Sequence, residues 1–196
     1  LLMLANISDS YADQKIYTTN RQNIELHGIS PQRLSSALKA VCDMGYETDG
    51  IEGIKDIVAC VGTTYCPKAV AETRKLHNLL DGLVRESVFE AISEAVRINI
   101  TGCPNSCSPY RIADIGFRGL RLRRTQGSVE GFEMLIGGDQ KNHGQKLGDF
   151  TTEDCVEVTR CVLKTFLSLR TEAETLTACV LRVGMEQFRK AVFSEV

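Results

Sequence analysis

The stretch TGCPNSCSPYRIADIG, Thr101 to Gly116, sets two cysteines with three residues between them in a turn of Gly, Pro, Asn and Ser. The residues before it, VRINITGC, alternate apolar and polar side chains as a strand does, and RIADIGFRGLRLRR after it also has a strand-like pattern. The sequence therefore predicts a strand-turn-strand unit whose turn carries Cys103 and Cys107. Two thiols do not complete a metal site, so they need partners elsewhere in the chain.

The segment CVGTTYC supplies those partners, because it holds Cys60 and Cys66 with five residues between them. Thiolates select zinc, copper(I) or iron–sulfur clusters, and four of them complete a tetrahedral zinc site or a cubane cluster. Structural zinc prefers gaps of about two to four residues, whereas the larger cube accepts wider loops. We therefore favour an iron–sulfur cluster on Cys60, Cys66, Cys103 and Cys107. Zinc, or four buried thiols without a ligand, are the alternatives.

A helix is predicted from Pro67 to Val84, because proline suits the first helical position and apolar residues follow at helical spacing. This prediction places Cys66 at a helix N-terminus, where backbone amides and the helix dipole would favour the charge of a reduced cluster.

Composition narrows the class of protein. The 196 residues are 43% hydrophobic and 24% charged with a formal net charge of -2, a globular balance that indicates neither nucleic acid nor an anionic membrane as partner. No apolar run is long enough to span a membrane, and the opening LLMLA is too short for a secretory signal. We expect a cytoplasmic protein, in which eight cysteines indicate metal or redox chemistry rather than disulfides.

The remaining pattern predicts two domains, residues 1–53 and 54–196. Residues 1–11 have helical spacing, 15–26 read as a strand, and a helix follows Ser30 and ends near Gly45. The polar stretch 47–56 reads as a linker. Beyond it, residues 131–139 predict a further strand, and the tail from Thr152 to Val196 predicts two helical segments. Because Leu1 already lies in a helical pattern, we expect the chain to begin inside a longer protein.

The cysteine pattern and TGCPNSCSPYRIADIGFRG together resemble the family of siroheme-containing sulfite and nitrite reductases. The resemblance extends to IYTTNRQNIELHGI, Ile16 to Ile29, in that family's ferredoxin-like half-domain, and to the glycine-rich FEMLIGGDQKNHGQKLG. It implies an α/β (α+β) fold, with a ferredoxin-like half-domain followed by a 4Fe–4S/siroheme domain of mixed sheet and flanking helices.

The resemblance also implies a function, the six-electron reduction of sulfite to sulfide or of nitrite to ammonia. The four cysteines would hold the cluster, and Cys107 would also ligate the siroheme iron. Arg21 and Lys55 would bind the substrate anion, Lys55 standing where the family often has arginine. Polar contacts to siroheme or anion are expected from Thr18, Thr19, Gln22 and Asn105.

The resemblance covers one repeat, whereas larger members have two, and no Lys-x-Lys pair of the kind those members carry is found in the sequence. A homodimer or hetero-oligomer would complete the site, with ferredoxin or a flavoprotein subunit as electron donor. The alternative function is an accessory electron-transfer or structural subunit that keeps the cluster but has no competent substrate site.

Several chemically capable residues have ordinary structural explanations. Cys155 and Cys161 are six positions apart in a helical segment, on different faces, so packing is expected. The same holds for Cys42 and Cys179. His27 reads as a structural histidine or a proton donor. The basic residues Arg118, Arg121, Arg123 and Arg124 fit a solvated strand face, or a surface for siroheme carboxylates or an acidic electron donor.

Overall fold

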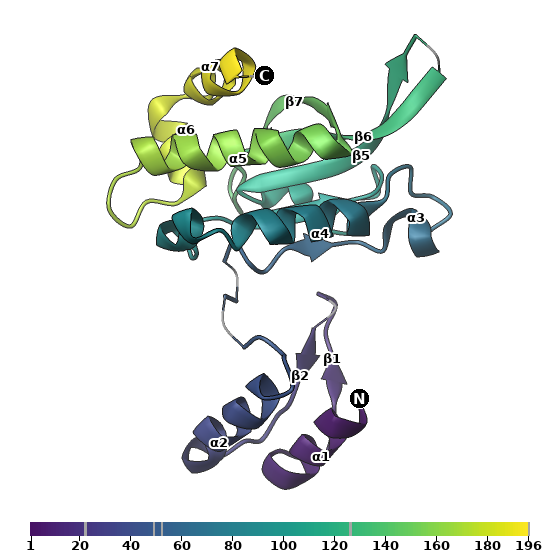
Figure 1. Ribbon diagram of the computed structural model, residues 1–196, viewed down its shortest axis with the longest axis vertical. Helices are drawn as coiled ribbons and strands as arrows, with labels where there is room; N and C mark the ends of the chain where they lie inside the picture. Colours follow the sequence, from purple (N-terminus) through teal and green to yellow (C-terminus); the bar gives the residue numbers. More distant parts are fainter. Residues whose placement is uncertain (22, 49, 52, 126, 196) are drawn as a thin grey trace. The chain divides into compact units, whose positions relative to one another are not determined.

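The computed structural model describes residues 1–21, 23–48, 50–51, 53–125 and 127–195 (Figure 1). The chain divides into two compact units, Leu1–Ile51 and Glu52–Val196. Within the described residues, no helix combines the length and apolar character needed to cross a membrane.

The first unit contains two helices and a short hairpin: α1 (Leu2–Tyr11), β1 (Tyr17–Thr18), β2 (Ile24–Glu25) and α2 (Pro31–Cys42). Ser30 and Pro31 begin α2 as expected, with proline at the first turn. The single strand predicted over residues 15–26 is wrong. The chain reverses between Thr19 and Asn23, where Thr19 N donates to Asn23 O at 3.0 Å, so that β1 and β2 pair antiparallel.

The second unit is built on a five-stranded mixed sheet in the order β3-β4-β5-β6-β7. Strand β4 pairs parallel with both β3 and β5, whereas β6 pairs antiparallel with both β5 and β7. Their bounds are β3 (Val58–Ala59), β4 (Ile98–Thr101), β5 (Ile115–Arg124), β6 (Gly127–Ile136) and β7 (Gln145–Thr151). This mixed sheet with its helices confirms the predicted fold class. Strand β7 was not predicted from the sequence, because its glycine and charged residues obscure the apolar alternation.

The helical elements of this unit are α3 (Gly62–Tyr65), α4 (Thr73–Val84), the 3-10 turns η1 (Ser87–Ile92) and η2 (Tyr110–Ile112), α5 (Thr152–Leu169), α6 (Leu176–Val183) and α7 (Met185–Glu195). The last predicted helical segment is broken at Gly184, whose positive φ of 86° ends α6.

The core lies between the sheet and the adjacent helices α4 and α5, which cross one face of it (Figure 1). Phe117 and Phe132 are fully buried there, edge to face with ring centroids 6.3 Å apart. Each such side chain contributes roughly 1.5–3 kcal/mol by leaving water. This packing fixes the sheet whose edge carries the cysteines.

Candidate metal centre

Two of the four candidate cysteines lie at the carboxyl edge of adjacent parallel strands. Cys60 directly follows β3, and Cys103 comes two residues after β4. Ala59 pairs with Ile100 in the parallel register, and Cys60 N donates to Ile100 O at 3.0 Å. Parallel strands bring the loops after them to one edge, so residues far apart in sequence meet there.

Gly102 joins these two loops directly. Its backbone amide donates a 3.1 Å hydrogen bond to Cys60 Sγ. A side chain at this position would be crowded, because a Cβ would lie 3.1 Å from Ala69 Cβ and 3.2 Å from Ala71 O. An amide aimed at a sulfur stabilises its thiolate form, which is the form that binds metal.

Cys66 ends the loop that starts at Cys60. It follows the short helix α3, and Cys66 N donates to Gly62 O at 3.0 Å. The expected helix N-terminus at Cys66 is wrong, since α4 begins only at Thr73. Residues 67–72 instead cross back toward β4, with Val70 N donating to Gly102 O at 2.9 Å. Cys66 is therefore held by a loop and not by the start of α4.

The second cysteine turn holds Cys103 buried and leaves Cys107 exposed. Ser106 adopts a left-handed φ of 56° within it, which reverses the chain between the two thiols. Asn105 is exposed in the same turn. Ser108 is buried and donates to Val58 O at 3.0 Å, which fastens the turn to β3. The exposed Cys107 sulfur is thereby accessible to a further group.

These thiols fit the donor chemistry of a cubane cluster. All four are free cysteines from two loops that meet at one sheet edge. Across the described ranges, no three or more His, Cys, Asp or Glu side chains converge as ligands of one metal ion would. The ligands of a cubane cluster do not converge on one ion, because each thiolate binds a different iron at a different corner.

Glu72 and Thr73 brace the first cysteine loop. Glu72 Oε2 accepts hydrogen bonds from the hydroxyls of Thr63 at 2.9 Å and Thr64 at 2.7 Å, and its Oε1 accepts from Arg74 N at 3.0 Å at the start of α4. Thr73 Oγ1 donates to Cys60 O at 2.5 Å. Burial raises the pKa of Glu72, but these hydrogen bonds outweigh it, so the pKa lies below its ordinary value.

Four residues that shape the site were not predicted from the sequence: Glu72, Thr73, Gly102 and Ser108. A signal was present for the first two, because a polar pair stood directly before the apolar stripe of α4. This N-cap signal was overlooked because the helix was predicted to begin at Pro67. No local pattern marked the Gly102 amide or Ser108, whose partners are 42 and 50 residues away.

Three of the other four cysteines pack in the core, as predicted. Cys155, Cys161 and Cys179 are buried in the cluster of side chains around α5 and α6. Burial raises the pKa of the Cys155 and Cys179 thiols. The packing prediction for Cys42 is wrong, because it lies exposed at the end of α2, 3.5 Å from Thr48 Oγ1.

The candidate anion-binding residues of the first unit lie at its hairpin. Thr18 is exposed in β1, and Thr19 Oγ1 accepts from Arg21 N at 3.2 Å and Asn23 N at 3.0 Å. The turn thus presents Arg21 between two strands. Gln22 lies outside the described residues. His27 stacks on Tyr17 and lies 2.8 Å from Glu25 Oε2, a hydrogen-bonded arrangement.

Lys55 lies at the opposite end of β3 from Cys60. Its Nζ is 3.8 Å from Glu90 Oε2 of η1, and the neighbouring Ile54 N donates to Ser93 O at 2.7 Å. The cysteine edge follows the carboxyl end of β3, whereas these contacts surround its amino end.

The basic residues of β5 differ in their surroundings. Arg118 is partly buried, and its Nε lies 2.9 Å from Glu133 Oε2 on the paired strand β6. It also lines a cavity of about 280 Å³ with Tyr110, Arg111 and His143 among others. Arg121, Arg123 and Arg124 are exposed further along β5.

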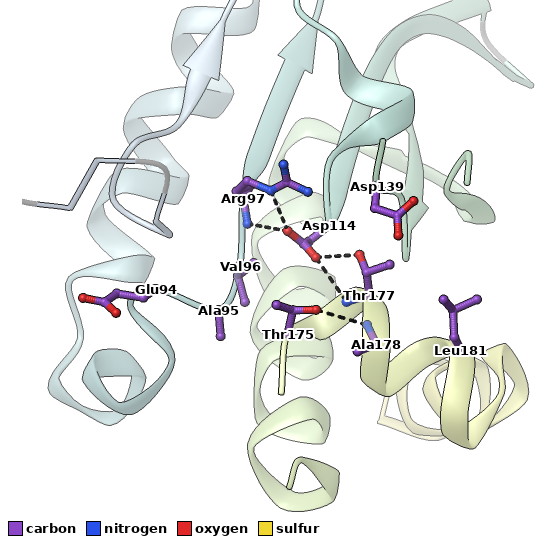
Figure 2. Close-up of a pocket in the computed structure, with 10 residues that line it drawn as sticks. All are labelled: Glu94, Ala95, Val96, Arg97, Asp114, Asp139, Thr175, Thr177, Ala178 and Leu181. Carbon is purple, nitrogen blue, oxygen red and sulfur yellow. Dashed lines mark hydrogen bonds and ion pairs between the residues drawn. The ribbon is translucent and has the colours of Figure 1, made fainter. Parts of the chain in front are cut away.

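A second cavity of about 290 Å³ opens at the amino ends of β4 and β5 (Figure 2). Its central group is the buried Asp114 carboxylate. Arg97 donates to it through its backbone N at 3.0 Å and Nε at 3.1 Å, and Thr177 through its backbone N at 3.1 Å and Oγ1 at 2.5 Å. Asp114 therefore ties both strands to the start of α6.

Comparison with known proteins now identifies the family. The family description "Nitrite and sulphite reductase 4Fe-4S domain" matches residues 50–196, and "Nitrite/Sulfite reductase ferredoxin-like half domain" matches residues 1–43. The chain belongs to the nitrite and sulfite reductase family. Membership confirms the resemblance drawn from the cysteine pattern, and the expected cofactors, a 4Fe–4S cluster and siroheme, are those of this family.

Individual members of the nitrite and sulfite reductase family are similar at modest identity. "Sulfite reductase [ferredoxin] 2" of Mycolicibacterium paratuberculosis is 27% identical over 198 residues, 96% of this chain and 36% of that protein. The chloroplastic ferredoxin–nitrite reductase of Oryza sativa subsp. japonica is 31% identical over 136 residues, 69% of this chain and 22% of that protein. The chain thus spans about a third or less of the length of these two relatives.

Two solved structures agree with the fold. The structure of the Mycobacterium tuberculosis NirA protein matches 95% of this chain and 36% of its own length, with a TM-score of 0.81 and 27% identity. Dissimilatory sulfite reductase I matches 98% of this chain with a TM-score of 0.74 and 11% identity, a likeness of fold alone.

Proposed function

We propose that this chain holds the 4Fe–4S cluster and the siroheme of an enzyme that reduces sulfite to sulfide, or nitrite to ammonia, with six electrons. The observation that carries the proposal is the meeting of the two cysteine loops at the carboxyl edge of β3 and β4, bridged by the hydrogen bond from Gly102 N to Cys60 Sγ. Bound together, the two cofactors supply single-electron transfer and a place for the anion.

The thiolates of Cys60, Cys66, Cys103 and Cys107 are the proposed cluster ligands. Cys107 is the exposed member of the set, and it would also hold the siroheme iron. Buried Cys103 and the loop braced by Glu72 keep their part of the site in place before the cofactor arrives. The protein's contribution is thus to hold the ligands and to limit movement during electron transfer.

Oxyanion binding is assigned to cationic side chains. Arg21 offers a planar fork that binds an oxyanion through two parallel hydrogen bonds. Lys55 offers a point charge but lies at the amino end of β3, away from the cysteine edge, so Arg21 is the principal candidate. Polar contacts to anion or siroheme are assigned to Thr18, Thr19 and Asn105. Sulfite is favoured over nitrite as the substrate, because the relatives named as sulfite reductases align with 96% of this chain, including the ferredoxin-like half-domain.

The electron donor is proposed to be a ferredoxin, as the names of those relatives state for them. A flavoprotein subunit is the other candidate. A homodimer or hetero-oligomer is proposed to supply the further cations of the substrate site.

The first experiment is the visible absorption spectrum of protein purified without oxygen, with iron and acid-labile sulfide counted on the same sample. Siroheme bands with a four-iron cluster, followed by turnover of sulfite or nitrite, support the proposal. In that event Arg21→Gln should raise the KM for the anion about tenfold or more, because one charged bidentate contact is lost. A cluster without siroheme would favour the accessory electron-transfer subunit, and a colourless zinc protein would exclude both.

A further inference from the structure

The hairpin of β5 and β6 extends beyond the sheet edge that carries the cysteines. In the parallel register of β4 and β5, Thr101 pairs with Arg118, which places Arg118 level with the last residue of β4. The strand then continues to Arg124. Six further residues at about 3.3 Å each carry the tip roughly 20 Å past that edge.

The projecting part is strongly basic. Arg121, Arg123 and Arg124 are exposed there, and the acidic side chain opposite Arg121 is Glu130. The chain as a whole has a net charge of -2, so this positive charge is local and stands against a negative background. Such a patch attracts an acidic partner and speeds its association at low ionic strength.

Contacts connect this hairpin to the first cysteine loop. A Cβ on Gly119 would lie 2.9 Å from Ala71 Cβ, so the loop covers the helix-facing side of β5 at the hairpin base. On the paired strand, Glu130 Oε2 accepts a hydrogen bond from Glu72 N at 3.3 Å. Because side chains alternate along a strand, Arg121 and Arg123 share the face of Gly119. Arg121 and Arg123 therefore flank the loop that starts at Cys60, and Arg124 lies on the opposite face of the strand.

The cysteine loop itself presents apolar side chains to solvent. Val61 is 41% exposed and Tyr65 is 71% exposed, both between Cys60 and Cys66. An exposed apolar group beside a charged rim is the usual composition of a protein-binding surface. We call Val61, Tyr65, Arg121 and Arg123 together the hairpin face.

We propose that the hairpin face docks an acidic one-electron carrier protein of the ferredoxin type. The inference rests on the proposed function and adds the surface by which electrons enter. The reduced carrier is oxidised by one electron and the docked protein is reduced by one, with no bond made or broken. Charge complementarity favours this occupant, because an acidic carrier fits the arginines and a small contact around Tyr65 suits a complex that must dissociate after each electron.

The test measures binding of an acidic [2Fe–2S] ferredoxin to the full chain reconstituted with its cluster, by calorimetry at low and moderate salt. The double variant Arg121→Glu/Arg123→Glu should raise Kd at least tenfold at low salt, and Arg121→Gln/Arg123→Gln should lie between it and the unchanged protein. The matched control is Lys164→Glu/Lys190→Glu, which makes the same change in net charge at exposed positions on α5 and α7. It should change Kd less than twofold.

Three outcomes overturn the proposal: no ferredoxin binding by the unchanged protein, equal losses in the hairpin and control variants, or unchanged ferredoxin binding with altered oligomeric state in the hairpin variant. The last would make the hairpin face a contact between copies of the chain. Reduction of the cluster by dithionite with methyl viologen separates this failure from that of the proposed function. If the cluster forms and takes up electrons from the small donor in every variant, only the docking surface is in question.

Discussion

The Gly102 amide lies 3.1 Å from Cys60 Sγ and hydrogen-bonds to it across the boundary between β3 and β4. One donor thereby links the two cysteine loops, although the residues are 42 positions apart. Because hydrogen bonds to cluster sulfurs stabilise added negative charge, this contact is expected to tune the reduction potential.

Gly102→Ala tests that role. The new methyl group would press on Ala69 Cβ at 3.1 Å, Ala71 O at 3.2 Å and Thr73 Cγ2 at 3.3 Å, so the amide must move away from the sulfur. We expect the midpoint potential of the cluster to fall by on the order of 50 mV, which corresponds to about 1.2 kcal/mol for one electron. Redox titration followed by electron paramagnetic resonance measures it.

Gly82→Ala is the control, since Gly82 lies exposed in α4 with open space around it. It should stabilise the fold by about 0.5–1 kcal/mol and leave the potential unchanged. An unaltered potential in Gly102→Ala would show that the hydrogen bond does not act on the cluster.

Cys107→Ser and Cys155→Ser form a matched pair. The first should disturb both the cluster and siroheme, seen as loss of visible absorbance and of bound iron, because it removes a proposed shared ligand. The second lies fully buried in the core and should keep both cofactors. It should lose about 1–3 kcal/mol of stability through burial of a hydroxyl. Equal loss of iron in the two variants contradicts the ligand assignment.

Glu72→Gln should destabilise the first cysteine loop by about 1 kcal/mol at neutral pH, because charged hydrogen bonds to Thr63, Thr64 and Arg74 N become neutral ones. The pKa of Glu72 is lowered in the folded protein. Its charge therefore stabilises the fold above the unfolded pKa of about 4.3, and this contribution is lost as pH falls through the folded value.

Urea unfolding of both proteins from pH 7 to pH 3 checks this. The stability difference between them should shrink toward the acid end. A difference that stays constant over the whole range would mean that the Glu72 charge plays no part.

Asp114→Ala should lower the free energy of unfolding by about 3–5 kcal/mol, because it leaves the Arg97 guanidinium without its carboxylate and the Thr177 amide without its acceptor (Figure 2). The Thr177 hydroxyl keeps Gly138 O as a partner at 2.8 Å. Thermal unfolding measures the loss. Thr177→Val removes only one of the donors, the hydroxyl, and should cost less, about 1–2 kcal/mol. If the two variants lose equal stability, the carboxylate is not the centre of this network.

Local patterns predicted several elements of the fold because their signals lie within the element. Pro31 after Ser30 marked the start of α2, and the alternation of VRINIT marked β4. The errors arose where a tertiary contact overrode a local signal. Pro67 suggested a helix start, yet residues 67–72 form a loop beside the end of β4, where Val70 N donates to Gly102 O. The helix begins later, and Glu72 is its N-cap.

The cysteine spacing by itself favoured an iron–sulfur cluster over zinc, since thiolate chemistry and gap length depend only on residue type and order. The resemblance to the family came from this spacing together with TGCPNSCSPYRIADIGFRG. Only the tertiary structure showed that Cys60 and Cys103 leave one sheet edge, that Gly102 bridges them, and that Cys107 alone of the four is exposed. These features depend on parallel pairing between β3 and β4, which is a contact between distant segments. No pattern within either segment encodes that pairing, because the packing of α4 and α5 on the sheet fixes it.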